Sequence, residues 1–137
     1  MQDGSHVGDD AFVVRETRQG AIAILTLARP QARNGLNLAM LAALQAAIDR
    51  LSTDRETSAV VVAAEGPAFC AGHDLKELTA HRRDDDGGRA FYALTMDRCA
   101  TMMTSIIRSP KPFIAAVENV ATAAGCQLVA TCDLAVA

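Results

Sequence analysis

The sequence predicts an α/β fold with a largely parallel β-sheet. Short apolar runs alternate with longer segments whose apolar residues recur at helical spacing. Two of the short runs, residues 59–64 (AVVVAA) and 113–117 (FIAAV), are apolar at every position, as in strands buried on both faces. Strands that alternate with helices pair in parallel, because each helix carries the chain back across the sheet. Neither a repeat nor a linker divides the chain, so a single domain is expected.

The N-terminal half is predicted to form a hairpin and then a helix. Residues 12–17 and 21–27 have strand composition, and Gln19-Gly20 between them fits a turn. Arg29-Pro30 ends the second strand and opens a loop that includes Ala32, Arg33, Asn34 and Gly35. Asn37 is a suitable N-cap for a helix over residues 38–51. The stripe expected on this helix consists of Leu38, Leu41, Gln45, Ile48 and Leu51.

The C-terminal half continues the alternation of strands and helices. Gly66-Pro67 ends the apolar strand, and a tight segment over residues 69–74 leads into a short helix. Residues 80–88 (AHRRDDDGG) are predicted to form a mobile surface loop. A long helix over residues 89–108 follows, with Phe91, Thr95, Cys99, Met102, Met103 and Ile106 on one side. The remaining expected elements are the strand 113–117, a turn at 118–119, a helix opening at Thr122 or Ala123 and a strand over 133–137.

Composition excludes several classes of protein. The chain has 137 residues and a formal net charge of -3, which argues against a nucleic-acid partner. Its apolar runs are all shorter than the roughly 18 residues that span a bilayer, so no membrane partner is expected. Residues 1–10 are polar and acidic, unlike a secretory or transit peptide. They are predicted to be a disordered leader to a domain over 11–137, in a cytoplasmic protein.

The four cysteines are predicted to be buried, reduced thiols. Cys70, Cys99, Cys126 and Cys132 lie among apolar or small residues, and none belongs to a C-x-x-C pair. His73 follows Cys70 by three residues, but no second ligand pair accompanies them. No metal site is therefore expected.

Two junctions between a strand and a helix carry the candidate chemistry. They are residues 68–75 (AFCAGHDL) and 120–128 (VATAAGCQL), and both use small residues where the chain turns. The first N–H groups of a helix have no intrahelical partner, and the helix dipole favours negative charge there. If the two junctions face each other, two N–H donors converge on one oxygen, as in an oxyanion hole. The alternative from these residues alone is a pair of ordinary turns, with Gly and Ala serving close packing.

Several motifs resemble those of the enoyl-CoA hydratase/isomerase (crotonase) superfamily. A-F-C-A-G-H-D-L resembles its A-F-x-A-G-x-D-L segment, and R-P-Q-A-R-N-G-L resembles its R-P-x-x-x-N-A-L loop. P-K-P-F-I-A-A-V and A-T-A-A-G-C-Q-L resemble its P-K-P-x-I-A-A-V strand and its G-G-G-x-x-L helix start. The resemblance covers residues 12–137, with the motifs in the family's order and spacing. It implies a crotonase-like spiral of ββα units, truncated here before the C-terminal helices that complete the fold and help form homotrimers or dimers of trimers.

The resemblance also implies roles for particular residues. The backbone N–H groups of His73 and Ala124 would form the oxyanion hole for an acyl-CoA thioester, with coenzyme A present only as part of the substrate and no permanent cofactor. The residues that would line the substrate are Ala32 and Arg33 near the nucleotide, Ala71, Gly72, His73, Asp74, Leu75 and Lys76 along the thioester and pantetheine, and Phe91, Leu94 and Thr95 at the acyl pocket. A His beside an Asp also raises the hypothesis that the His73 side chain is a base oriented by Asp74.

The sequence departs from the family pattern at the catalytic acids. Gln127 stands where hydratases have the first of two glutamates, and an amide does not exchange a proton near neutral pH. The second glutamate would lie after residue 137. Asn119 and Gly35 also replace the usual Gly and Ala. The leading hypothesis is therefore an acyl-CoA enzyme that stabilises a thioester enolate.

Two alternatives remain at this point. One is a non-catalytic or weakly active acyl-CoA-binding or scaffolding member of the same fold, which Gln127 favours. The other is a dinucleotide-binding domain, but A-T-A-A-G-C lacks the G-x-G-x-x-G spacing that such a domain needs.

Overall fold

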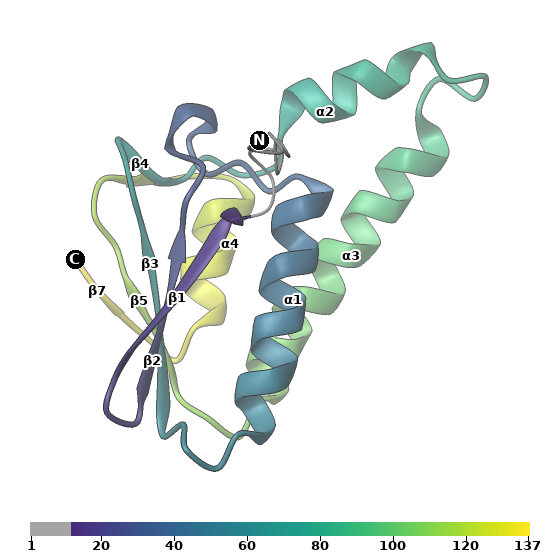
Figure 1. Ribbon diagram of the computed structural model, residues 1–137. Coiled ribbons are helices and arrows are strands. Elements are labelled where there is room, and N and C mark those ends of the chain that lie inside the picture. The colour runs from purple at the N-terminus through teal and green to yellow at the C-terminus, as the bar shows by residue number, and fades with distance from the viewer. Residues whose placement is uncertain (1–11) are drawn as a thin grey trace, which may run out of the picture.

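A computed structural model describes residues 12–137 and contains a five-stranded sheet (Figure 1). The strands are β1 (Val14–Gln19), β2 (Ile22–Leu27), β3 (Ala59–Ala64), β5 (Phe113–Ala116) and β7 (Leu134–Val136), in the order β1-β2-β3-β5-β7. Only β1 and β2 pair antiparallel, and the other neighbours pair in parallel. The predicted α/β class, the hairpin and the largely parallel sheet are confirmed. The leader predicted for residues 1–10 lies outside the described residues.

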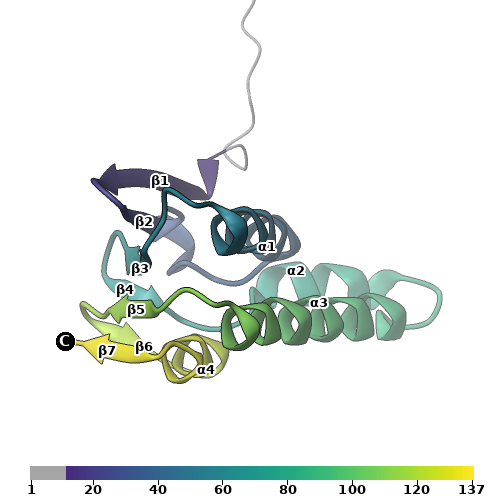
Figure 2. The same ribbon diagram turned by 90° about the horizontal axis from the view of Figure 1, so that it is seen from below.

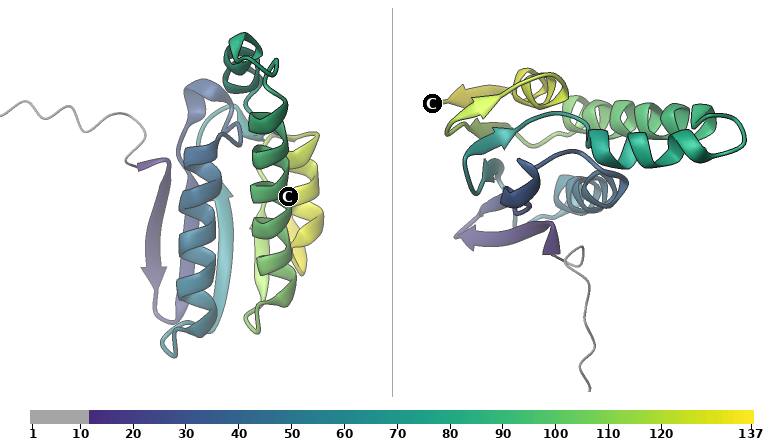
Figure 3. Two further views of the ribbon diagram at one scale, coloured as in Figure 1. Left: turned by 90° about the vertical axis from the view of Figure 1, so that its right-hand side faces the viewer. Right: turned by 90° about the horizontal axis from the view of Figure 1, so that it is seen from above.

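The helices pack on one face of this sheet. They are α1 (Leu38–Thr53), α2 (Leu75–Ala80), α3 (Arg89–Arg108) and α4 (Ala124–Thr131), with two 3₁₀ turns, η2 (Pro30–Ala32) and η3 (His81–Arg83). Figure 3 shows α1, α3 and α4 side by side in front of the strands. Figures 1 and 2 show that α2 and the start of α3 project beyond the sheet as an antiparallel pair. The chain therefore has one helix-covered face and one face without helices in residues 12–137.

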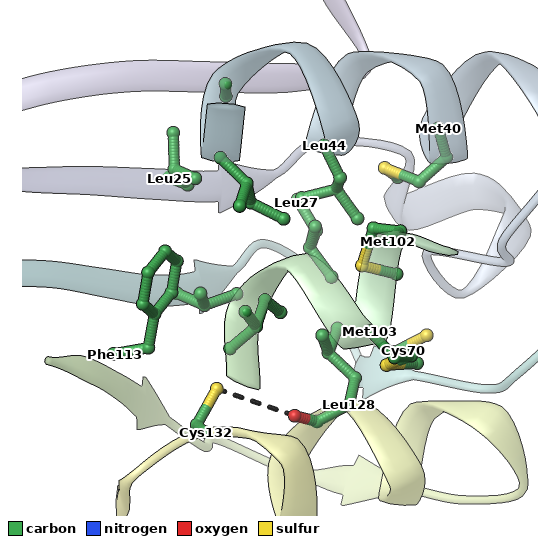
Figure 4. Close-up of a cluster of buried hydrophobic side chains, with 14 of the residues drawn as sticks. Leu25, Leu27, Met40, Leu44, Cys70, Met102, Met103, Phe113, Leu128 and Cys132 are labelled. Atoms are coloured by element: carbon green, nitrogen blue, oxygen red, sulfur yellow. Dashed lines mark hydrogen bonds between the residues drawn. The ribbon is translucent and has the colours of Figure 1, made fainter. Parts of the chain in front are cut away.

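The hydrophobic core lies between the sheet and the helices. Leu25 and Leu27 of β2, Leu44 of α1, Phe113 of β5 and Leu128 of α4 meet there and are almost completely buried (Figure 4). Sulfur-containing side chains fill the remaining space, namely those of Met40, Cys70, Met102, Met103 and Cys132. Flexible thioethers suit an irregular core that has few aromatic rings.

Burial of the strands differs from the prediction of strands covered on both faces. In β3, Val60 and Val62 are buried, but Val61 and Ala63 are only partly buried. β5 shows the same alternation. The physical reason is that helices cover only one face of the sheet within the described residues, so alternate side chains point away from the core.

The stripe of α1 also differs in part from the prediction. Leu41, Ile48 and Leu51 are buried, whereas Leu38 and Gln45 are only partly so. The core contacts are completed by Met40, Leu44 and Ala47. Gln45 lies at the edge of this face, where its amide donates to Asp49 and to Ser105 at 2.9 and 2.8 Å. An amide at a helix–helix boundary is thus satisfied without entering the core.

The loop predicted over residues 80–88 is partly helical. α2 ends at Ala80, η3 continues directly after it, and only the turn that follows is irregular. The Asp86 carboxylate accepts hydrogen bonds from the N–H groups of Gly88 and Ala90 at 2.9 and 2.8 Å. These bonds satisfy donors at the start of α3, and they lower the pKa of Asp86.

Three of the four cysteines are buried as predicted. Cys70, Cys99 and Cys132 lie in the core, and burial raises the pKa of Cys132 to about 11. Cys126 is exposed, which contradicts the prediction for that residue. The reason is its place on α4, whose buried residues are Gly125 and Leu128, on a different side of the helix.

Candidate functional site

A short parallel pair of strands brings the two junctions together. β4 (Ala68–Cys70) pairs with β6 (Val120–Ala121), and the N–H of Thr122 donates to the carbonyl of Cys70 at 3.1 Å. The sequence predicted a tight segment and a turn at these places, not this pairing. Because each strand leads directly into one junction, the pairing sets both junctions at the same end of the molecule.

The first junction turns at Gly72 and starts α2 at Leu75. Gly72 has a φ of 97°, a conformation that side chains disfavour. Asp74 is the N-cap of α2, and its Oδ1 accepts from the N–H of Glu77 at 3.1 Å. His73 therefore lies between a left-handed glycine and a helix cap.

The second junction is a tight turn from Thr122 to Gly125. The N–H of Gly125 donates to the carbonyl of Thr122 at 2.9 Å, and Ala123 has φ 51° and ψ −127°. These angles match the first central position of a type II′ turn, where Gly dominates. Gly125 packs against β4, because a Cβ on it would overlap the carbonyl oxygen of Cys70. The helix starts later than predicted, at Ala124, since Ala123 belongs to the turn.

The strained conformation of Ala123 predicts that Ala123→Gly stabilises the protein. A non-glycine residue in this region costs about 1–3 kcal/mol, of which glycine's greater chain entropy cancels about 0.5–1 kcal/mol. We expect the free energy of unfolding, measured by denaturant titration, to rise by about 0.5–2 kcal/mol. Ala130→Gly is the matched control, since Ala130 is exposed on α4 and its replacement should destabilise by about 0.5–1 kcal/mol. Equal losses in both variants would contradict the interpretation.

The two candidate oxyanion donors lie at the contact between these junctions. A Cβ on Gly72 would lie 3.2 Å from the nitrogen of Ala124 and 2.9 Å from the Cβ of Ala123. Within residues 12–137, neither the N–H of His73 nor that of Ala124 donates a hydrogen bond. Ala124 is the first residue of α4, and no side chain caps that helix. The structure therefore brings two N–H groups without protein acceptors next to a small-residue contact.

The His73 side chain does not pair with Asp74. The Asp74 carboxylate instead binds Arg29 and the N–H of Glu77. Nδ1 of His73 is buried and has no hydrogen-bond partner among the described residues. Burial lowers the pKa of His73, and the backbone of Leu36 offsets this in part. The hypothesis of a base oriented by Asp74 is not supported by this arrangement.

The loop with Ala32 and Arg33 lies beside the first junction. The N–H of Ala71 donates to the carbonyl of Arg33 at 3.0 Å, and Arg33 is exposed with a φ of 53°. Leu75 and Lys76 are exposed at the start of α2. The bond between Ala71 and Arg33 thus joins the loop to the first junction, and Arg33, Ala71, Leu75 and Lys76 are exposed there, whereas Gly72 is buried. Their contact with a nucleotide or with pantetheine stays a prediction.

The three residues predicted at the acyl pocket have different surroundings. The Phe91 ring stacks on that of His81, with centroids 3.5 Å apart. Leu94 lines a groove of about 400 Å³ between α3 and α1, together with Leu38 and Leu41. Thr95 is buried, and its hydroxyl donates to the carbonyl of Phe91. Their place in an acyl pocket stays a prediction.

Gln127 is exposed on the first turn of α4. Its N–H donates to the carbonyl of Ala123 at 3.1 Å, and its carbonyl accepts from the Thr131 hydroxyl at 2.7 Å. Within the described part of the chain, its side-chain amide has no hydrogen-bond partner. The amide is therefore available to a ligand or to water close to the turn that carries Ala124.

Two residues that sequence reasoning passed over support the first junction. Arg29 was interpreted only as a strand breaker, but its guanidinium lies within 3.2 Å of the Asp74 carboxylate. Asn34 is fully buried, and its amide nitrogen lies within hydrogen-bond distance of the carbonyls of Glu65, Ala68 and Phe69. The available signal was the motif R-P-x-x-x-N, which contains both residues. Residues 12–137 contain no cluster of three or more metal-ligating side chains.

Within residues 12–137, the fold and the site define a largely parallel α/β protein whose two strand-to-helix junctions meet at small residues. The chain belongs to the enoyl-CoA hydratase/isomerase family, whose model matches residues 17–137. The A-T-A-A-G-C-Q-L motif also predicts a likeness to enoyl-CoA hydratase domain-containing protein 3 within this family, and the likeness is confirmed. The human mitochondrial protein of that name is 44% identical over 113 residues, which cover 82% of this chain and 36% of the relative.

Other relatives have named activities of their own. The 2,3-dehydroadipyl-CoA hydratase of Escherichia coli is 35% identical over 88% of this chain and 44% of the relative. Among solved structures, an enoyl-CoA hydratase of Mycobacterium smegmatis is 50% identical and matches with a TM-score of 0.82 over 90% of this chain and 46% of its own. Human enoyl-CoA hydratase domain-containing protein 3 has the same TM-score at 41% identity, over 90% of this chain and 47% of its own. This chain thus spans less than half the length of these relatives. The crotonase-like fold is confirmed.

Proposed function

We propose that the chain forms part of an acyl-CoA enzyme that stabilises a thioester enolate between the N–H groups of His73 and Ala124. The observation that carries this proposal is the close approach of the two junctions: a Cβ on Gly72 would lie 3.2 Å from the nitrogen of Ala124, and neither the His73 N–H nor the Ala124 N–H has an acceptor among the described residues. A thioester carbonyl gains negative charge when a proton leaves its α-carbon. Donors held in place before the reaction stabilise that charge, each by about 2.7–4 kcal/mol.

The electrostatics of the second junction support the same assignment. Ala124 begins α4, so the positive end of the helix dipole lies at its N–H. The first turn of α4 contains no acidic residue that would oppose an oxyanion. A developing oxyanion would therefore meet a site of favourable potential.

The second candidate function is acyl-CoA binding with little or no turnover. The observation that favours it is Gln127, which carries an amide where hydratases carry a carboxylate. The exposed, unpartnered amide can hold a water molecule but does not accept its proton near neutral pH. The two candidates share the oxyanion contact and differ in whether a proton is then transferred at the bound thioester.

Binding to matched ligands tests the shared contact. A saturated acyl-CoA and its S-alkyl analogue, a thioether, differ only in the carbonyl oxygen. We expect the intact protein to bind the thioester at least about threefold more tightly, because a net hydrogen bond contributes about 0.5–1.5 kcal/mol. Calorimetry measures both affinities. Equal affinities, or a ligand-bound structure with the thioester oxygen away from both N–H groups, would refute the proposal.

Several properties of the whole protein are part of the same proposal. The substrate would bring its own coenzyme A, and no permanent cofactor is needed. Assembly as a homotrimer or a dimer of trimers and a cytoplasmic location also remain proposals. Relatives carry the word mitochondrial in their names. Among residues 12–137, no helix combines the length and apolar character required to cross a bilayer.

A further inference from the structure

We infer that Arg29 is a positioning residue that fixes the His73 N–H against Ala124 through its ion pair with Asp74; this inference rests on the proposed function. Arg29 follows β2 and does not belong to either junction. One of its nitrogens, Nη1, lies 3.1 Å from the carbonyl oxygen of Gly35 and 3.2 Å from Oδ2 of Asp74. Arg29 therefore joins the loop over residues 29–35 to the residue that directly follows His73.

The ion pair is shielded from solvent. The Arg29 and Asp74 side chains are only 14% and 13% exposed, whereas the pairs of Arg15 with Glu65 and of Arg50 with Glu16 are far more exposed. Salt and water weaken exposed pairs much more than buried ones. A shielded pair with directed hydrogen bonds can therefore hold a backbone segment in place, which an exposed pair does poorly.

Asp74 transmits this restraint to both sides of the junction. Its second oxygen caps α2 through the N–H of Glu77, and the Glu77 carboxylate accepts from the N–H of Leu38 at 3.0 Å. The single carboxylate of Asp74 is thus tied to the loop, to α2 and, through Glu77, to the start of α1. A shift of Asp74 would move the peptide that precedes it.

The peptide that carries the His73 N–H is held from the same loop. Its carbonyl belongs to Gly72 and accepts from the N–H of Leu36 at 2.7 Å. In a trans peptide the C=O and N–H groups point in opposite directions. Because the Gly72 carbonyl faces the loop, the His73 N–H faces away from it. The orientation of the donor therefore depends on the distance between the loop and residues 72–74, which Arg29 spans.

The loop over residues 29–35 is held in place by hydrogen bonds of Asn34, so the Arg29 side chain joins Asp74 to a fixed part of the structure. Asn34 is fully buried, and its Oδ1 accepts from the N–H of Arg29 at 2.8 Å. Its amide nitrogen faces the carbonyls that surround β4, including that of Ala68 at 3.0 Å. Loss of the Arg29 side chain would leave these contacts in place and remove its bonds to Asp74 and to the Gly35 carbonyl.

The test compares the thioester and thioether affinities in variants of the intact protein. In Arg29→Gln, we expect the preference for the thioester to fall by about threefold or more, while thioether affinity changes by less than about twofold. A defect that is merely structural would weaken both ligands together. Arg29→Lys should recover part of the preference, since it keeps the charge but not the planar fork. Arg18→Gln is the control, because it removes an ion pair with Asp54 at the end of the β1–β2 hairpin that lies away from Arg29. It should leave the preference for the thioester unchanged.

A second variant keeps the inference falsifiable if Arg29→Gln does not fold. Asp74→Asn preserves an oxygen for capping α2 but removes the charge that Arg29 binds, and it should lower the thioester preference as Arg29→Gln does. An unchanged preference in either folded variant would overturn the role of Arg29. A wild-type protein without any thioester preference would instead overturn the proposed function, and this inference with it.

Discussion

Removing the N–H of Ala124 is expected to lower thioester turnover by the intact protein by about 100-fold or more. Proline lacks this donor, and the first position of a helix tolerates proline because its N–H needs no intrahelical acceptor. Ala124 occupies that position in α4. Ala124→Pro therefore removes one proposed oxyanion contact without breaking the helix. Steady-state kinetics on a panel of enoyl-CoA and 3-hydroxyacyl-CoA thioesters measures the effect.

The residue before the new proline determines how cleanly this experiment can be done. Ala123 has a positive φ, and a residue before proline prefers extended angles. The substitution is therefore best made with Ala123→Gly, which relieves the strain at that position. The matched control is Ala123→Gly with Ala124→Gly, which keeps the N–H and should retain most of the turnover. Unchanged turnover in the folded proline variant would rule out Ala124 as a donor.

Most of the secondary structure could be predicted because its signals are local. Asn37 was expected to cap a helix, and its Oδ1 accepts from the N–H of Met40 at 2.8 Å. The alternation of apolar runs and helical stripes located β3, β5 and α3. Each of these signals needs only a few neighbouring residues, so the sequence alone contains them.

The parts that could not be predicted depend on contacts between distant residues. The pairing of β4 with β6 joins segments about fifty residues apart, and neither strand has a run long enough to reveal it. The bond between Arg29 and Asp74 spans 45 positions. No periodicity marks a side chain whose partner lies elsewhere in the chain. The strain at Ala123 was missed for the same reason, since small residues allow many conformations and the packing of α4 on β4 selects one of them.

In the candidate site, the backbone positions followed from local sequence signals, whereas the side-chain partners depended on distant residues. Small residues after buried strands indicated the two junctions, and the structure brings them so close that a Cβ on Gly72 would lie 3.2 Å from the nitrogen of Ala124. The side chain of His73 was harder to interpret, because its neighbour Asp74 in sequence turned out to bind Arg29. Proximity in sequence therefore predicted where the backbone donors lie better than which side chains pair.

Replacing Gln127 with Glu is expected to raise hydration of a short enoyl-CoA by about 10²-fold or more in the intact protein. General acid–base groups contribute about 10²–10⁴-fold, and the Gln127 amide can orient water without accepting its proton. Gln127 is exposed on the first turn of α4, four residues before Thr131, so a carboxylate fits there without burial. The gain requires a second acid, which the family resemblance places after position 137.

Spectrophotometric loss of the enoyl thioester measures this gain, and two controls define its origin. Ala130→Glu adds the same charge one turn further along the exposed side of α4 and should give no increase. The activity gained by Gln127→Glu should also fall as pH drops toward the ordinary glutamate pKa of about 4.3, because only the ionised carboxylate accepts a proton. Rapid hydration by the unmodified protein, with no gain from Gln127→Glu, would show that residue 127 does not limit the reaction. Gln127 would then be part of the wall of the site, and the proton would be accepted by a group on another segment.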